Sequence, residues 1–291
     1  MNWFDSIILG IVEGITEFLP VSSTGHLTIV EKLLGHSIDS PAVTAFTAII
    51  QVGAIAAAIL YFRKDIVRLA VGWFTGLFHA DKRGTDYRLG WAVILGSIPI
   101  GLVGLIFHHL IETTLRSLWF VAGALIVWSF VLWIADRHCD HLSTQAPQRS
   151  AESAGLRGEQ DLTIVDALII GSTQCLALIP GVSRSGATIS AALLRGIDRQ
   201  TATRWSFFLG IPALTLSGIL QAITNVDEIS TYVGWGPTAA ATVVSFGVAY
   251  ASIAWLLKFV STNRFTAFIV YRILIGLVII ALLVTGGILA V

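Results

Sequence analysis

Six apolar stretches of about 20 residues or more constrain this chain more than any other feature, because a helix of that length crosses a bilayer. They cover residues 42–62, 89–111, 117–135, 205–226, 232–257 and 265–289. The first five contain no charged residue, and the sixth contains only Arg272. Charged residues make up 12% of the chain and hydrophobic residues 55%, which is too little polar surface for a soluble core. The sequence predicts an all-α, polytopic membrane protein.

Two further apolar regions, 6–34 and 162–195, are interrupted. The first is broken at Pro20 and the second at Pro180, so each half is too short to cross a bilayer. Irregular backbone at membrane depth persists only where it is buried in protein or lines a wet cavity. We therefore predict two re-entrant helix hairpins in addition to six transmembrane helices.

The two interrupted regions resemble each other at a constant offset of 161 residues. The matches are Gly10 with Gly171, Glu13 with Gln174, Ser22 with Ser183, Gly25 with Gly186, Gly35 with Gly196, and Phe46 with Phe207. Three spans separate the copies, so the pattern predicts an inverted-topology repeat with its site near the membrane midplane. We expect a first repeat in residues 1–136, a cytoplasmic linker in 137–161 and a second repeat in 162–291.

The distribution of basic residues predicts the orientation. Most of them lie in 63–88, 137–161, 195–204 and 258–264, which fall on one side of the membrane if the spans alternate. The positive-inside bias makes that side cytoplasmic, so both termini and the open end of the first hairpin face outward. Basic and acidic residues balance at 18 each, so nothing in the charge points to a nucleic acid partner.

The first interruption carries a cluster of polar side chains. Glu13 and Glu17 are four residues apart and share a helix face, where two carboxylates need a cation, a shared proton or water. A metal or proton site is the favoured interpretation, and a solvated pair is the alternative. Ser22, Ser23, Thr24 and Gly25 follow, and they can cap a helix or present donors to an anion. His26 comes next, as a nucleophile, general acid/base or ligand.

The second interruption reads Ser183, Arg184, Ser185, Gly186 and, two residues later, Thr188. Arginine at membrane depth is costly unless it is paired, and its planar fork of donors matches phosphate oxygens. We interpret Arg184 as an anion clamp, with a structural pair to a glutamate as the alternative. Carboxylates on one hairpin and this cradle on the other suggest a metal–phosphate complex with Mg²⁺ or Ca²⁺ between them.

Two polar residues lie inside spans. Gln51 is expected either to join helices by a hydrogen bond or to belong to the site. Arg272, beside Tyr271, is expected either to extend its side chain to the cytoplasmic interface or, like Gln51, to belong to the site.

These residues resemble the undecaprenyl-diphosphate phosphatase family of the bacitracin-resistance type. The similarity rests on the run from Glu13 to His26, the run from Pro180 to Thr188, the stretch 45–53 and Tyr271-Arg272, and it covers essentially the whole chain. It implies catalytic roles for Ser23, His26 and Arg184, an acidic motif in Glu13 and Glu17, and substrate-phosphate binding by the neighbouring hydroxyls and glycines.

The resemblance also implies a reaction and a location. A C55 polyprenyl diphosphate loses its terminal phosphate with the help of a divalent cation, at an outward-facing site in the bacterial inner membrane. This recycles the lipid carrier for cell-wall synthesis and confers bacitracin resistance. The partners are the lipid substrate and membrane lipids, and a homodimer is compatible with the family.

The roles within the site stay open at this level. Ser23 or His26 could attack phosphorus, or His26 could activate water; we favour Ser23 with His26 as its acid/base partner. The alternative function is a secondary transporter or lipid-phosphate flippase, because inverted repeats and broken helices are typical of transporters.

Overall fold

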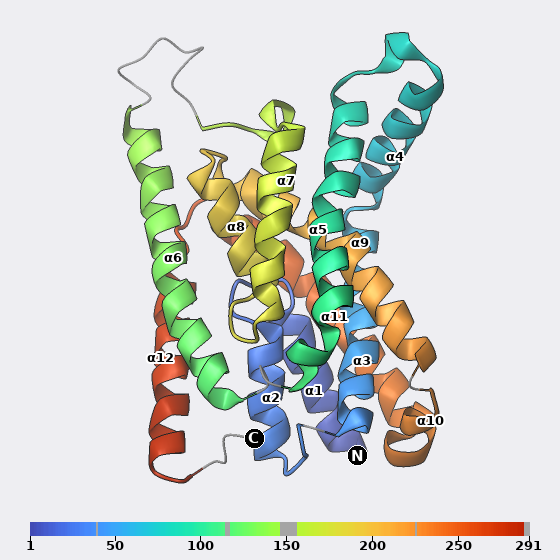
Figure 1. The fold of residues 1–291 in the computed structure, drawn as a ribbon, viewed down its shortest axis with the longest axis vertical. Coiled ribbons are helices and arrows are strands. Elements are labelled where there is room, and N and C mark those ends of the chain that lie inside the picture. Colours follow the sequence, from blue (N-terminus) through green and yellow to red (C-terminus); the bar gives the residue numbers. More distant parts are fainter. Residues whose placement is uncertain (39, 114–116, 146–155, 225, 288–291) are drawn as a thin grey trace.

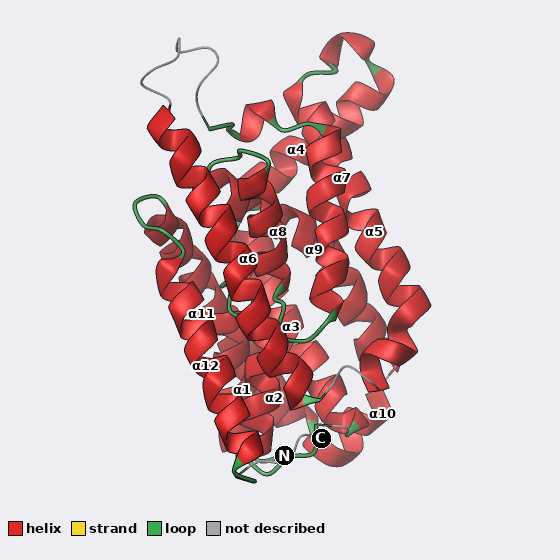
Figure 2. Ribbon diagram, turned by 60° about the vertical axis from the view of Figure 1, so that its left-hand side comes forward, coloured by secondary structure: helices red, strands yellow, loops and turns green. Residues whose placement is uncertain are grey.

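The fold is an assembly of helices that run roughly along the long axis of the molecule (Figure 1). The computed structural model describes residues 1–38, 40–113, 117–145, 156–224 and 226–287. Within these ranges there is no β-strand, only one isolated bridge between Arg157 and Ile197 (Figure 2). The predicted all-α fold is therefore confirmed for the described residues.

Twelve α-helices follow one another along the described parts of the chain. They are α1 (Trp3–Thr16), α2 (Ser23–Leu33), α3 (Pro41–Tyr61), α4 (Arg63–Phe78), α5 (Thr85–Thr113), α6 (Leu118–Gln145), α7 (Ile164–Thr173), α8 (Arg184–Leu194), α9 (Arg199–Thr224), α10 (Val226–Glu228), α11 (Trp235–Val260) and α12 (Thr266–Val284). Four short turns of 3-10 or π helix lie between them: η1 (Ala80–Lys82), η4 (Glu159–Asp161), η5 (Gln174–Leu178) and η6 (Ile229–Val233).

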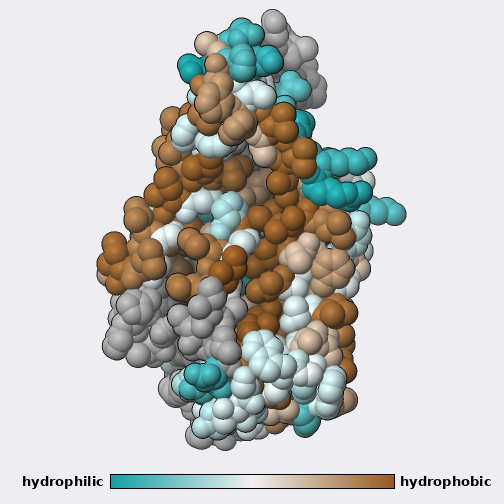
Figure 3. Space-filling model, turned by 90° about the vertical axis from the view of Figure 1, so that its right-hand side faces the viewer, coloured by the Kyte–Doolittle hydropathy of each residue, from teal (hydrophilic) through white to brown (hydrophobic). Residues whose placement is uncertain are grey.

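Five of the described helices are long and apolar enough to cross a membrane: α3, α5, α6, α11 and α12. Their outward surfaces carry large exposed hydrophobic side chains such as Leu102, Val127 and Val243. Apolar residues cover much of the middle of the face in Figure 3, and hydrophilic residues gather mainly toward its ends. The chain is thus a multi-pass membrane protein. The expected fourth span, α9, has 26 residues but does not belong to this group of five.

Two connections differ from their sequence-based prediction. Residues 63–78 were expected in a hydrophilic connection, yet they form α4. Large apolar side chains recur there every three or four residues and form a stripe that is exposed along one side of the helix, at Val67, Val71, Phe74 and Phe78. Residues 137–145, expected in the linker, continue α6. The linker residues 146–155 lie outside the described ranges.

Each interrupted region forms two short helices, α1 with α2 and α7 with α8. These helices have 10 to 14 residues, or about 15–21 Å at the helical rise, which is less than the thickness of a hydrocarbon core. Between α7 and α8 the chain first tightens into η5. The breaks fall at the predicted prolines.

An aspartate ties the open end of each helix pair. The carboxylate of Asp5 on α1 lies 2.9 Å from Nε2 of His36, just after α2. At the offset of 161, Asp166 on α7 accepts from Nε of Arg195, just after α8, at 2.9 Å and also pairs with Arg157. The two helix pairs are therefore closed in the same way.

Small residues allow the first helix of each pair to pack tightly on a long helix. A Cβ atom at Gly10 of α1 would lie 2.5 Å from the carbonyl oxygen of Ala241 on α11. A Cβ atom at the equivalent Gly171 of α7 would lie 1.9 Å from the carbonyl oxygen of Gly96 on α5. Such close approach is typical of helix packing in membranes.

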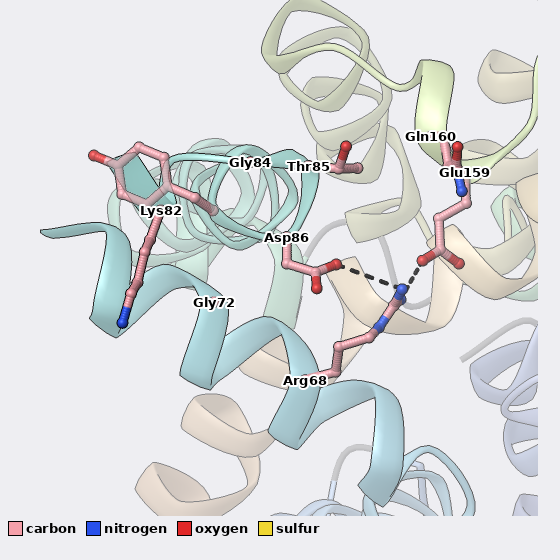
Figure 4. A pocket seen from close by; sticks show the side chains of 9 residues that line it. Arg68, Gly72, Lys82, Gly84, Thr85, Asp86, Glu159 and Gln160 are labelled. Carbon is pink, nitrogen blue, oxygen red and sulfur yellow. Dashed lines mark hydrogen bonds and ion pairs between the residues drawn. The ribbon is translucent and has the colours of Figure 1, made fainter. Parts of the chain in front are cut away.

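A network of ion pairs joins elements at the end of the molecule opposite the start of α1 (Figure 1). Arg68 of α4 reaches Asp86 of α5 at 3.4 Å and pairs with Glu159 of η4 beside a polar cavity (Figure 4). The hydrogen bond to Glu159 raises the pKa of Arg68, so the guanidinium stays protonated. Arg204 of α9 joins the same network through Asp65 at 3.2 Å. None of the predicted site residues lines this cavity.

Candidate active site

Arg272 of α12 brings the two interruptions together. Its side chain is completely buried. The guanidinium donates to the carbonyl oxygens of Pro20 at 3.0 Å, Gly181 at 2.9 Å and Val182 at 3.0 Å, and to Oγ of Ser129 at 3.2 Å. The expectation that Arg272 extends to the cytoplasmic interface is wrong. Its charge is held by backbone carbonyls that the breaks leave without helical partners.

A second contact joins the breaks directly. The hydroxyl of Ser185 on α8 donates to the carbonyl oxygen of Leu19 at 2.9 Å and lies 3.1 Å from the hydroxyl of Ser183. The two predicted polar clusters, 167 residues apart at Glu17 and Arg184, therefore form one site.

The second helix of each pair starts from the same unusual turn. Ser22 and Ser183 have φ angles of 77° and 76°, and they are the only residues other than glycine with positive φ in the described chain. Their hydroxyls accept from the amides of Gly25 at 3.4 Å and Gly186 at 3.1 Å. Positive φ costs free energy, so such residues cluster where function requires a particular backbone shape. The amides of both glycines are engaged in these caps.

Glu17 is the centre of the polar contacts. One carboxylate oxygen, Oε2, accepts from the hydroxyl of Ser23 at 2.7 Å and from the amide of Gln51 at 3.3 Å. The other, Oε1, lies 3.4 Å from Nη2 of Arg184, in an ion pair whose side chains are 4% and 9% exposed. The structure thus brings together the predicted residues Glu17, Ser23, Arg184 and Gln51.

The guanidinium of Arg184 lies against α9. Its Nη1 donates to the carbonyl oxygen of Ser206 at 2.9 Å, while its buried Nε has no hydrogen-bond partner. A Cβ atom at Gly210 would lie 2.1 Å from Nη1, so glycine makes room for the planar group. Thr188 on α8 also contacts α9 beside Arg184, since its hydroxyl donates to that of Ser206 at 2.7 Å.

Glu13 lies one turn before Glu17 and is almost fully buried. Its Oε1 has no hydrogen-bond partner, and the carboxylates of Glu17 and Glu31 and the guanidinium of Arg184 act on it electrostatically. Gln174, at the equivalent place in the second helix pair, is also buried with both side-chain polar atoms unpaired. An orphaned carboxylate oxygen is the kind of ligand that a hard divalent cation takes.

His26 is held by both ring nitrogens. Nδ1 lies 2.7 Å from the carbonyl oxygen of Ser22, and Nε2 lies 2.7 Å from the hydroxyl of Tyr271 on α12. The hydroxyl of Ser23 is directed to Glu17 instead. The favoured partnership between Ser23 and His26 is therefore not the arrangement in the structure.

The remaining predicted residue, Thr24, is exposed at the start of α2. Sequence reasoning missed Tyr271 as a partner of His26, and also Ser129 and Ser206. A signal for Tyr271 existed, because it stands beside Arg272 within an otherwise apolar helix. No local signal marks Ser129 or Ser206. Ser129 accepts a hydrogen bond from Arg272, and the carbonyl oxygen of Ser206 accepts one from Arg184, and only the fold brings these partners together.

The arrangement suits attack on a phosphate. A serine hydroxyl donates to a buried carboxylate that can take its proton, and an arginine beside them can neutralise phosphate charge. No group of three or more His, Cys, Asp or Glu residues that could hold a metal occurs in the described chain. A cation there would need ligands from the substrate, as Mg²⁺ commonly has with one or two carboxylates and phosphate oxygens.

Comparisons with known proteins agree with this chemistry. A family model described as "Bacitracin resistance protein BacA" matches residues 6–278. The chain is 59% identical over 295 residues to an undecaprenyl-diphosphatase of Cutibacterium acnes, with 98% of this chain and 99% of the relative covered. It is 58% identical over 287 residues to undecaprenyl-diphosphatase 3 of Frankia casuarinae, with 98% of each chain covered.

Proposed function

Because the chain belongs to the bacitracin resistance protein BacA family, we propose that it hydrolyses undecaprenyl diphosphate to undecaprenyl phosphate and inorganic phosphate. The observation that carries this proposal is the contact of the Ser23 hydroxyl with Glu17, which in turn pairs with Arg184. The reaction recycles a lipid carrier for cell-wall synthesis, and it accounts for the family's link to bacitracin resistance.

The contacts support a two-step reaction. Glu17 takes the proton of the Ser23 hydroxyl, whose oxygen forms a bond to the terminal phosphorus as the bond from that phosphorus to the bridging oxygen breaks. Undecaprenyl phosphate leaves with the bridging oxygen. Glu17 releases its proton to solvent. Water then attacks the phosphorus of the phosphoserine, and one proton of the water passes through Glu17 to Oγ of Ser23 as the bond from Oγ to phosphorus breaks and inorganic phosphate leaves. Arg184 stabilises the charge on the phosphate oxygens in both steps.

Glu13 and Glu17 fit a divalent cation, Mg²⁺ or Ca²⁺. The unpaired Oε1 of Glu13 supports this proposal, because a buried carboxylate oxygen without a donor is costly. Such a cation, when bound, supplies charge neutralisation for the diphosphate. The hydroxyls of Ser22 and Ser183 would stay in their helix caps, where they shape the turns around the phosphate.

The membrane topology that we propose is six spans and two re-entrant hairpins in an inverted repeat. Three equivalences at the offset of 161 support it: the positive φ of Ser22 and Ser183, the positive φ of Gly35 and Gly196, and the aspartate contacts that close both helix pairs. In this arrangement the first hairpin opens outward, so the site faces the outside of the bacterial inner membrane.

Cysteine labelling tests this orientation. Thr262, in the exposed turn between α11 and α12, should be cytoplasmic, and Thr231, exposed in η6, should be outside. We expect a membrane-impermeant thiol reagent on intact cells to label Thr231→Cys and to miss Thr262→Cys, in a background that carries Cys175→Ser. The reverse pattern would contradict the outward-facing site.

Phosphate release from purified protein tests the function. In detergent, the protein should release inorganic phosphate from undecaprenyl diphosphate, and a chelator should stop this until Mg²⁺ or Ca²⁺ is restored. Ser23→Ala should lose nearly all turnover, while Ser190→Ala serves as a folded control. A transporter or flippase, which the inverted repeat would also suit, needs two compartments and would release no phosphate in detergent.

A further inference from the structure

Tyr271 makes a contact with His26 that the reaction above does not use. Its hydroxyl lies 2.7 Å from Nε2 of His26. The two rings are nearly parallel, with centroids 5.5 Å apart and planes inclined by 10°. Hydrogen bonding and ring contact together restrict both the position and the rotation of the imidazole.

The other side of the imidazole defines the hydrogen-bond roles. Nδ1 lies 2.7 Å from the carbonyl oxygen of Ser22, and a carbonyl oxygen can only accept. Nδ1 must therefore carry a hydrogen. In the neutral ring Nε2 then has a lone pair and accepts from the hydroxyl of Tyr271. Neither nitrogen is left to act on Ser23, whose hydroxyl donates to Glu17.

The contact between His26 and Tyr271 also links two helices, α2 and α12. His26 lies in the first turn of α2, the same turn that begins with Ser23, and the residue is 8% exposed. Tyr271 lies on α12 next to Arg272, which holds the carbonyl oxygens of both breaks. The tyrosine therefore anchors the turn that carries the proposed nucleophile to the helix that joins the two breaks.

We propose that Tyr271 is a positioning residue, which holds His26 in the Nδ1-protonated form and so keeps the first turn of α2, with Ser23, in place for phosphoryl transfer. This inference rests on the proposed function for its kinetic consequence alone. The contact with His26 has its own spectral signature, so the two parts can be tested separately.

The variant Tyr271→Phe removes the hydroxyl and keeps the ring. We expect kcat for undecaprenyl diphosphate to fall about tenfold to a hundredfold, the range seen when a histidine at a metal site loses the partner that orients it. KM should stay within about twofold, because a positioning residue acts on the reacting geometry rather than on uniform substrate binding. Tyr250→Phe is the matched control, since the ring of Tyr250 packs against Tyr61 and Tyr250 is none of the site residues named above; it should leave kcat unchanged.

Two further measurements separate positioning from a structural role. In ¹⁵N-histidine spectra, assigned with His26→Gln, wild-type His26 should show a protonated Nδ1 and an Nε2 that accepts a hydrogen bond, and Tyr271→Phe should shift the Nε2 resonance. In a His26→Gln background, measured at high enzyme concentration, Tyr271→Phe should cause no further loss.

An unchanged Nε2 resonance, an unchanged kcat in Tyr271→Phe, or an equal loss of rate in the His26→Gln background would each overturn the proposal. A wild-type protein that releases no phosphate would contradict the proposed function instead. The spectra would still show whether Tyr271 holds His26.

Discussion

Arg184→Lys should lower kcat by about a hundredfold to a thousandfold, the usual effect of removing a donor that stabilises transition-state charge. The guanidinium makes two contacts at once: Nη2 pairs with the carboxylate of Glu17, and Nη1 donates to the carbonyl oxygen of Ser206. Its Nε has no hydrogen-bond partner. A lysine ammonium is a single point of charge and cannot reproduce this planar fork. Stability should change little, because the positive charge still balances Glu17.

Both quantities should be measured on one purified sample, as kcat for undecaprenyl diphosphate and Tm in detergent. Arg195→Lys is the matched control: Arg195 pairs with Asp166 at the open end of the second helix pair, and its side chain is 42% exposed. It should turn over normally. A stable Arg184→Lys protein with wild-type kcat would show that the arginine is not a phosphate clamp, and a large drop in Tm with normal turnover of the folded fraction would make it structural.

Arg272→Met should have the opposite signature, a large loss of stability. The substitution keeps an unbranched side chain but leaves three buried carbonyl oxygens and the hydroxyl of Ser129 without their donor. Each buried group that loses its partner costs about 1–3 kcal/mol, so the total should reach several kcal/mol. Because this side chain binds carbonyl oxygens of both breaks, we expect their relative placement to be disturbed when it is lost.

Thermal unfolding in detergent and the yield of monodisperse protein are the measurements. Ser129→Ala removes one of the four contacts and should cost only about 1 kcal/mol, which makes it a graded control at the same place. If Arg272→Met unfolds at the wild-type temperature, the carbonyl contacts are not what holds the two interruptions together.

Much of the architecture follows from local sequence. Hydrophobic length predicted the segments of α3, α5, α6, α11 and α12, because the bilayer sets the length of an apolar helix. Pro20 and Pro180 predicted the two breaks, since proline cannot continue the hydrogen bonding of a helix. Glu13, Glu17, Ser23 and Arg184 stood out because charge and hydroxyl groups are rare and costly inside apolar helices.

Local sequence misjudged the regions where composition is mixed. Residues 63–78 carry enough charge to look like a connection, but they form the helix α4, with an exposed apolar stripe at helical spacing. The extension of α6 to Gln145 was missed because polar residues do not end a helix once it leaves the membrane. Hydropathy indicates whether a segment is apolar enough to lie within the bilayer, whereas the ends of a helix depend on its backbone hydrogen bonds.

The sequence by itself determined most of the residues that we propose for the chemistry, but the tertiary structure alone decided how they pair. The offset of 161 indicates that two broken helices are equivalent, yet it does not show that Arg272 lies between them or that Ser23 donates to Glu17 rather than to His26. Helical spacing defines the face on which a side chain lies. The partner that it meets depends on the rotation and crossing of helices far apart in the chain, and those follow from packing at positions such as Gly10 and Gly171.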